Sequence, residues 1–368
     1  MSQQVVAGWI INAMERGRIP DGITRRLIGR LCRTRLNQVA REYRETAASG
    51  NCGLQDFADR MRCGPVAPVP EKANQQHYEV PADFFALMLG PCFKYSCCFF
   101  ASDQASLEEA ELTSLQMTCE HADLQDGQQV LETGCGWGSL TLYMLEQYPN
   151  LTVTAVSNSA SQREFIEQRA ATAGVRERLT VITADMNDFA PDRLFDRIVS
   201  CEMFEHMRNY EVLLHRMSGW LEPAGKMLIH IFCHRDYAYE FEADGQTNWM
   251  GRYFFTGGIM PSRNLLDQFN RHLQVTRSWD WDGTHYQRTC EAWLKRLDAN
   301  REPALAILAR VYGPDQAHRW LHRWRMFLLA GSELFGHESG RQWQVGHFLL
   351  EPVPGRAREP VTAEVLPA

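Results

Sequence analysis

Residues Val130–Gly138 read VLETGCGWG, and this stretch decides the fold that we expect for the chain. A short apolar run ends in the acidic Glu132, three glycines follow at alternate positions, and a helical segment comes next at Ser139–Tyr148. Glycine is needed where the backbone adopts a positive φ or approaches a ligand closely. The helix N-terminus after such a turn favours negatively charged or polar groups. The third glycine of the dinucleotide fingerprint G-x-G-x-x-G is missing, so the pattern indicates a different ligand loop.

Strands and helices alternate along the chain after this turn. The pattern predicts strands at Leu151–Ser157, Leu179–Asp185, Phe195–Met203 and Lys226–Cys233, with helices at Ser161–Gly174 and Asn209–Leu221. Such alternation is typical of parallel βαβ units in a doubly wound α/β sheet. Ligands of these sheets bind in the crevice beyond the carboxyl ends of the strands. Polar residues gather at those ends, which predicts a ligand site formed by Glu132, Ser157–Gln162, Asp185 and Glu202–His206.

The composition argues against several classes of partner. The 368 residues carry a net charge of −7 without a basic run, so we expect no nucleic-acid partner. No apolar stretch reaches the length of a membrane span and the N-terminus lacks a signal-peptide pattern, so we expect no stable membrane insertion. Eleven cysteines without C-x-x-C or clustered Cys/His spacing indicate reduced thiols in a cytoplasmic protein and no metal site.

Motifs around the alternating region indicate a family. They are QQHYEVP at Gln75–Pro81, KYSCCFF at Lys94–Phe100, SLEEA at Ser106–Ala110, CEMFEHM at Cys201–Met207, RYFFTGG at Arg252–Gly258 and GTHY at Gly283–Tyr286. Together with the E-x-G-x-G-x-G turn they resemble the cyclopropane fatty acid synthase superfamily of class I methyltransferases, which use S-adenosylmethionine (SAM). Within it the chain resembles the coclaurine-type N-methyltransferases of plant benzylisoquinoline alkaloid synthesis. The resemblance runs from about Asn74 to Leu350.

The resemblance implies a Rossmann-like seven-stranded sheet whose final strands are Gln274–Asp280 and Gln344–Glu351, the last of them antiparallel. Apolar residues at helical spacing predict helices before the sheet, and glycines and prolines mark a linker after them. In chain order we expect a helical region at 1–64, a linker at 65–73, a methyltransferase domain at 74–351 with cap insertions at 237–262 and 285–340, and a flexible tail at 352–368.

SAM is the cofactor that the resemblance implies. The residues expected to bind it are Tyr95, Ser96, Glu132, Gly134, Gly136, Asn158, Gln162, Asp185 and Met186. Tyr95 and Ser96 match a pair that reaches the methionine end of the cofactor. Most methyltransferases grip the ribose with a carboxylate at the second strand, whereas this superfamily uses side chains such as Asn158 and Gln162. Asp185 is placed to accept from the adenine amino group.

The resemblance assigns substrate binding and proton removal to Glu202, Glu205 and His206. An amine near neutral pH is mostly protonated, and a carboxylate beside an imidazole can take that proton. We therefore predict Glu205 and His206 as a proton-handling pair, with Glu202 and Glu79 stabilising the cationic amine. The same acids would also suit a strand end that merely caps the next helix at Asn209. Further substrate contacts are expected from Tyr78, Glu79 and Tyr286.

Two other readings fit the same sequence. In cyclopropane synthases a bicarbonate ion acts as the base, and the residues that hold it match Cys97, Glu205, His230 and Tyr286. Cys97 is notable because the plant N-methyltransferases usually have serine at this position. The second alternative is a SAM-binding protein that has lost catalysis, although the intact glycine turn and the intact EMFEH segment argue against it.

Aromatic residues in the two predicted insertions bear on substrate choice. Over the carboxyl edge of the sheet they would suit a flat aromatic amine through stacking and cation–π contact, and they would equally enclose an acyl chain. The partner that we expect is a small-molecule amine, and a homodimer is compatible with the sequence.

Overall fold

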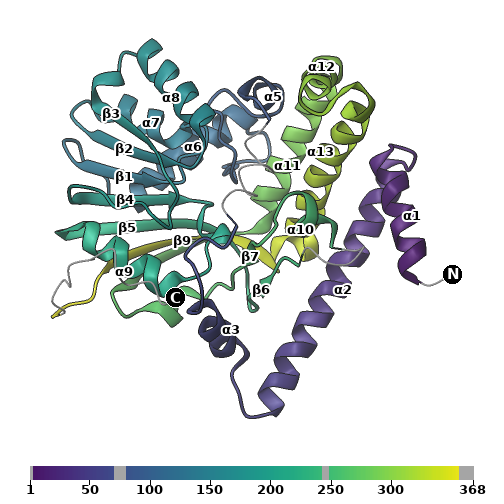
Figure 1. The fold of residues 1–368 in the computed structure, drawn as a ribbon, viewed down its shortest axis with the longest axis horizontal. Helices are drawn as coiled ribbons and strands as arrows, with labels where there is room; N and C mark the ends of the chain where they lie inside the picture. The colour runs from purple at the N-terminus through teal and green to yellow at the C-terminus, as the bar shows by residue number, and fades with distance from the viewer. Residues whose placement is uncertain (1–2, 70–79, 243–247, 356–368) are drawn as a thin grey trace.

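A computed structural model describes residues 3–69, 80–242 and 248–355 (Figure 1). Its centre is a seven-stranded sheet in the order β3-β2-β1-β4-β5-β9-β8. The strands are β1 (Gln129–Thr133), β2 (Thr152–Ser157), β3 (Leu179–Thr183), β4 (Phe195–Cys201), β5 (Leu221–His234), β8 (Leu273–Trp281) and β9 (Trp343–Pro352). β1 to β5 pair in parallel, and β9 runs antiparallel to both of its neighbours. The predicted seven-stranded α/β sheet with an antiparallel last strand is confirmed.

Three predicted strand ends differ from the structure by two residues or more, and one of them is the end of β4, which lies at Cys201 and not at the predicted Met203. β5 begins at Leu221, whereas the sequence predicted its start at Lys226. The residues between them include Pro223 and Gly225, which are typical of a turn. In the structure Leu221 nevertheless pairs with Phe195 of β4, and the register of the two strands shifts after this pair. β3 ends at Thr183, so Asp185 lies in the loop beyond the strand that was expected to contain it.

Helices cover both faces of the sheet. α6 (Leu107–His121), α7 (Ser139–Gln147) and α8 (Ala160–Thr172) share one apolar core with it, and α3 (Gly53–Met61) and α9 (Tyr210–Trp220) share the other. Neighbouring strand residues belong to opposite cores: Val199 and Leu228 lie on the first side, Ile198 and Ile229 on the second. Strand side chains alternate between faces, so a run of apolar residues without polar gaps marks a strand buried on both.

Local sequence signals set several helix starts. Ser106 and Glu109 form a capping box at α6, in which each side chain bonds the backbone of the other residue. Asn209 caps α9 by accepting from the Val212 amide. The acids of the EMFEH segment therefore do not supply this cap, and the alternative that they serve only as caps loses its support.

A further group of helices stands beside the end of the sheet where the parallel strands finish (Figure 1). It comprises α1 (Gln3–Glu15), α2 (Asp21–Ala48), α5 (Ala82–Met88), α10 (Trp249–Tyr253), α11 (Gly283–Ala299), α12 (Arg301–Tyr312) and α13 (Pro314–Phe335). The two-stranded sheet of β6 (Tyr239–Glu240) and β7 (Ile259–Met260) lies with them, and short 3₁₀ turns span Arg176–Arg178, Phe204–His206, Leu266–Phe269 and His337–Gly340. The helices α11 to α13 fall in the predicted insertion between the last two strands.

The described part of the predicted linker is packed into the sheet domain. Val66 and Ala67 are buried, and both backbone groups of Ala67 bond the Asn187 side chain at 2.9 Å. The Val66 carbonyl accepts from the Arg208 amide at 2.7 Å. The described part of this segment, 65–69, therefore supplies core side chains and fixed backbone bonds to the sheet domain. Residues 70–79, with Tyr78 and Glu79, and the tail beyond 355 lie outside the described residues.

A buried ionic cluster attaches the N-terminal helices to the cap. Glu15, at the end of α1, is 5% exposed and accepts from the Trp249 indole at 3.0 Å. Its other oxygen lies 3.1 Å from both Arg319 and Arg323 of α13. Three donors from two separate elements thus converge on one carboxylate.

We predict that Glu15→Ala destabilises the protein by about 3–5 kcal/mol, because it leaves buried cations and an indole N–H without their acceptor. Chemical denaturation followed by circular dichroism measures the loss. Glu45→Ala is the matched control: Glu45 forms an exposed pair with Arg41, and its removal should change stability by less than about 1 kcal/mol. Equal stability of the two variants would refute this role of the cluster.

Candidate active site

Two adjoining cavities lie beyond the carboxyl ends of the parallel strands. Both are lined by Gly134, Gly136, Glu202 and His206. One extends over β2 and β3, and the other extends under the cap. The polar strand ends singled out in the sequence therefore do meet at one edge of the sheet, because all of these strands run in the same direction.

The glycine turn forms the floor between the two cavities. Gly134 and Gly136 have φ values of +75° and +52°, which side chains disfavour. A Cβ on Gly134 would lie 2.8 Å from Met203. A Cβ on Gly136 would meet no atom of the described residues within 4 Å and would project into the open space that both cavities share. The turn thus leaves room for a ligand that lies directly on the backbone.

The cavity over β2 and β3 has the donors and acceptors that a nucleoside requires. Its walls include Asn158, Gln162, Asp185 and Met186. The Gln162 carbonyl oxygen accepts from the Ser157 hydroxyl at 2.6 Å. Among the described residues its buried amide nitrogen has no hydrogen-bond partner, and an unpaired donor at the wall of a cavity favours a ligand acceptor such as a ribose hydroxyl. These residues fit the adenosine part of SAM.

The cavity under the cap continues from the glycine turn. Tyr95, Ser96 and Glu132 line its inner end. Glu132 is buried and accepts from the Thr141 hydroxyl. Burial raises the pKa of this carboxyl to about 8, and the Thr141 hydrogen bond acts in the opposite direction. All nine residues predicted to bind SAM lie at the walls of the two cavities.

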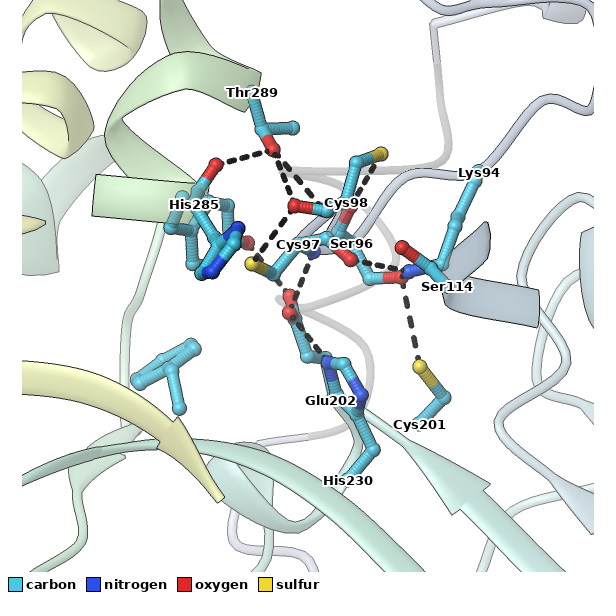
Figure 2. A network of polar contacts seen from close by, with 12 residues as sticks. Lys94, Ser96, Cys97, Cys98, Ser114, Cys201, Glu202, His230, His285 and Thr289 are labelled. Atoms are coloured by element: carbon cyan, nitrogen blue, oxygen red, sulfur yellow. Dashed lines mark hydrogen bonds and ion pairs between the residues drawn. The ribbon is translucent and has the colours of Figure 1, made fainter. Parts of the chain in front are cut away.

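Three donors converge on the Glu202 carboxylate at the centre of the site, and Figure 2 shows two of them, the Cys97 amide and the His230 ring. Tyr286 donates its hydroxyl at 2.6 Å, the Cys97 amide donates at 2.9 Å, and His230 lies at 3.2 Å. Glu202 has a φ of +48°, an uncommon backbone conformation for a residue other than glycine. This conformation directly follows β4, and the surrounding bonds hold it in place.

Two further histidines extend this network away from the cavity. His230 on β5 lies 2.6 Å from His347 on β9, and His347 lies 2.8 Å from the half-buried His121 on α6. Burial lowers the pKa of each ring, to about 4 for His121. A neutral imidazole has one N–H and one acceptor nitrogen. The three rings can therefore all point their N–H groups towards Glu202, whose pKa burial raises and the Lys94 charge lowers.

The structure separates the two members of the predicted proton-handling pair. His206 lines both cavities and stacks on Phe255 with the ring planes 9° apart. Glu205 is fully buried, lines neither cavity, and accepts from the Phe232 amide at 2.9 Å. Burial, and then the nearby Glu202 charge, raise the pKa of Glu205 well above its ordinary value. The 3₁₀ turn at Phe204–His206 is the cause, because it directs consecutive side chains to different sides.

Three of the four residues expected to hold bicarbonate in the alternative reading meet at one point. That point is occupied by the carboxylate of Glu202, which bonds Cys97 through its amide, His230 through its ring and Tyr286 through its hydroxyl. Cys97 is buried and burial raises the pKa of its thiol well above the ordinary value. Among the described residues no group of His, Cys, Asp or Glu has the arrangement of a metal site.

Aromatic side chains from both insertions form the outer wall of the cap cavity. Phe241 and Phe255 come from the segment before β8, and Trp293, Phe327 and Phe335 come from α11 and α13. Trp249 and Phe254 pack instead in the cap core. The cavity therefore places aromatic surface opposite an imidazole and a carboxylate. None of the helices in the described ranges is long and apolar enough to cross a membrane.

Sequence reasoning missed two residues of the site. Lys94 precedes the Tyr95–Ser96 pair and lines the cap cavity, although its motif had been noted only for the neighbouring residues. His347 lies in the apolar last strand, where a lone histidine carries no signal. Its role depends on β9 pairing with β5, where it stands opposite His230.

Comparisons with known proteins agree with this geometry. The family model for mycolic acid cyclopropane synthetase matches residues 69–345. The chain is 36% identical to (S)-coclaurine N-methyltransferase from Thalictrum flavum subsp. glaucum over 93% of its own length and 95% of that protein. It is 30% identical to cyclopropane-fatty-acyl-phospholipid synthase from Escherichia coli (strain K12), over 84% of this chain and 74% of that enzyme.

A solved structure extends the similarity to the fold. The crystal structure of coclaurine N-methyltransferase bound to N-methylheliamine and S-adenosylhomocysteine (SAH) superimposes with a TM-score of 0.88 at 35% identity, covering 93% of this chain and 98% of that one. SAH is the product that remains when SAM gives up its methyl group. Because the family model spans most of the chain and these similarities cover nearly all of it, the chain belongs to the mycolic acid cyclopropane synthetase family and is a SAM-dependent methyltransferase.

Proposed function

We propose that this protein transfers the methyl group of SAM to the nitrogen of a small amine, of the tetrahydroisoquinoline or benzylisoquinoline type. The similar Thalictrum protein is named for N-methylation of (S)-coclaurine, and the superimposed enzyme holds N-methylheliamine. The outer cavity wall of Phe241, Phe255 and Trp293 suits a flat aromatic ligand that carries a cation.

The position of Glu202 is the observation that carries this proposal. A bicarbonate ion held by the residues of the alternative reading would need the donors of Cys97, His230 and Tyr286, and these already bond Glu202. A fixed carboxylate there attracts a cationic ammonium, whereas a second anion at the same place would be repelled. The site therefore favours an amine over an alkene that needs a mobile base.

The chemistry requires a free electron pair on nitrogen. SAM supplies an electrophilic methyl group, and its sulfur keeps the electron pair of the broken bond. His206 stands at the junction of the two cavities and is our candidate for the base that takes one proton from the substrate ammonium. The freed electron pair forms the new N–C bond, so a secondary ammonium leaves as a tertiary ammonium and one proton returns to solvent.

The two carboxyl groups have different tasks in this proposal. Burial raises the pKa of Glu202, whereas the Lys94 cation and the donors of Cys97 and Tyr286 act in the opposite direction. In this proposal Glu202 is the ionised carboxyl that balances the charge of the bound ammonium. Glu205 stays protonated, because two buried carboxyls so close together resist ionising both. It acts as a positioning residue that fixes the Phe232 backbone behind the site. The remaining rate enhancement comes from aligning the substrate nitrogen with the methyl group of SAM.

Methyl transfer from radiolabelled SAM should occur with a tetrahydroisoquinoline amine and should be independent of added bicarbonate. Vesicles of unsaturated phospholipid should accept no label under the same conditions. The physical reason is that the Glu202 carboxylate already occupies, beside Tyr286, the position that a bicarbonate ion would need. Bicarbonate-dependent labelling of the acyl chains, without activity on any amine, would instead establish the cyclopropane reaction.

Glu202→Ala should lower amine turnover by about 100-fold or more, because the counter-charge for the ammonium is lost. The emptied position keeps the donors of Cys97, His230 and Tyr286, so millimolar bicarbonate should restore part of the rate of the variant and leave the wild type unchanged. Chloride at the same ionic strength is the control. A variant with wild-type turnover would remove Glu202 from the mechanism.

His206→Ala and Glu205→Gln separate the base from its buried neighbour. The first variant should lose about 10²–10⁴ in rate at neutral pH, with partial recovery at higher pH as free amine accumulates. Its affinity for SAH, measured by calorimetry, should stay nearly unchanged. Glu205→Gln should retain most of its turnover, because glutamine resembles the protonated acid. Comparable losses in both variants would show that the two residues handle the proton together.

The stability of Glu205→Gln gives an independent check. Glutamate in an unfolded chain ionises near pH 4.3, whereas the folded protein keeps Glu205 protonated, so folding takes up a proton above that pH. The wild type should therefore lose stability relative to the variant as pH rises from about 4.3, by up to about 1.4 kcal/mol per pH unit. Denaturation curves across this range test the sign.

A further inference from the structure

Lys94 is a buried cation to which the mechanism proposed above gives no role. Its side chain is 1% exposed, and its ammonium donates to the Ser96 hydroxyl and the Cys97 carbonyl, both at 2.6 Å (Figure 2). Within the described part of the chain no carboxylate oxygen lies within ion-pair distance of it. A lysine in such a position is uncommon, because a buried charge is costly unless it is paired.

The surroundings keep this ammonium charged. Burial acts to lower the pKa of Lys94, but nearby ionisable groups, among them the Cys201 thiol and the Glu202 carboxylate, hold it above its ordinary value. The two acceptors that it bonds are neutral. A third N–H of the ammonium therefore remains for an anion that enters the neighbouring space and binds the cation directly.

The cavity under the cap supplies that space. Lys94 lines it together with Ser96, Glu132 and Gly134, at the end next to the glycine turn. An ammonium only donates, so the Ser96 oxygen must accept from it, and the Ser96 hydroxyl hydrogen stays available to a second acceptor. Lys94 and Ser96 thus form a paired donor site, with the carboxyl of Glu132 on the same wall.

We propose that Lys94 binds the α-carboxylate of the methionine part of SAM, acting together with the Ser96 hydroxyl. The amino-acid end of the cofactor carries one negative and one positive charge. The Lys94–Ser96 pair suits the carboxylate, and Glu132 suits the ammonium. The cofactor carboxylate then gives Lys94 a directly bonded anionic partner, which explains why a cation is retained in this apolar interior.

The test compares SAH with two analogues, one without the carboxylate and one without the amino group, in calorimetric titrations that need no methyl acceptor. The wild type should bind the decarboxylated analogue roughly 10- to 100-fold more weakly than SAH, as expected for a lost charge-assisted hydrogen bond. Lys94→Met should weaken SAH binding by a similar factor and should bind the decarboxylated analogue as the wild type does.

The deaminated analogue is the internal control. Its affinity relative to SAH should be the same in the wild type and in Lys94→Met, because the ammonium faces a different side chain. Lys94→Arg, which keeps the charge, should regain part of the affinity for SAH and none for the decarboxylated analogue. Thermal melts without ligand establish that each variant is folded.

Two results would overturn the proposal. One is equal binding of SAH and its decarboxylated analogue by the wild type, a measurement that needs no variant. The other is a folded Lys94→Met protein that loses affinity for all three ligands by the same factor, which would make Lys94 a purely structural residue. Ser96→Ala, which removes the hydroxyl and keeps the cation, should show a smaller loss confined to ligands with the carboxylate.

Discussion

The carboxylate of Glu202 is the interaction on which the rest of the site depends. It follows the last residue of β4 in an uncommon backbone conformation, and it receives donors from a loop, a strand and a cap helix. These elements are far apart in the chain, so a single buried acceptor joins the sheet to the cap. In the function that we propose, an anion at this point also favours an amine acceptor, because it takes the place that a diffusible base would need.

Charge in this interior is balanced around the two cavities. Burial raises the pKa of both Glu202 and Glu205, and the Lys94 cation acts in the opposite direction at Glu202. The histidines behind Glu202 stay neutral for the same reason and serve as oriented dipoles. Since buried charges are costly without partners, the arrangement is consistent with a site completed by charged ligands, one from the cofactor and one from the acceptor.

The helical cap and the N-terminal helices are joined by buried polar contacts. Glu15 of α1 joins Trp249 of the short helix α10 to α13, and α13 also supplies cavity residues such as Phe327. Aromatic residues of the cap therefore lie in two places, the cavity wall and the cap core. Their composition alone does not separate the two, because both environments bury apolar surface.

The sequence by itself determined the sheet, the glycine turn and the cofactor edge. Strand alternation and glycines with a positive φ are local properties. Because parallel strands bring their carboxyl ends together, the position of residues such as Gln162 and Asp185 at this edge of the sheet was predictable. Only the tertiary structure decided which side chains of EMFEH face the cavity, because one 3₁₀ turn sends His206 inward and Glu205 behind it. It also decided the partners of Lys94 and His347, since these depend on long-range pairing and burial, which no local pattern encodes.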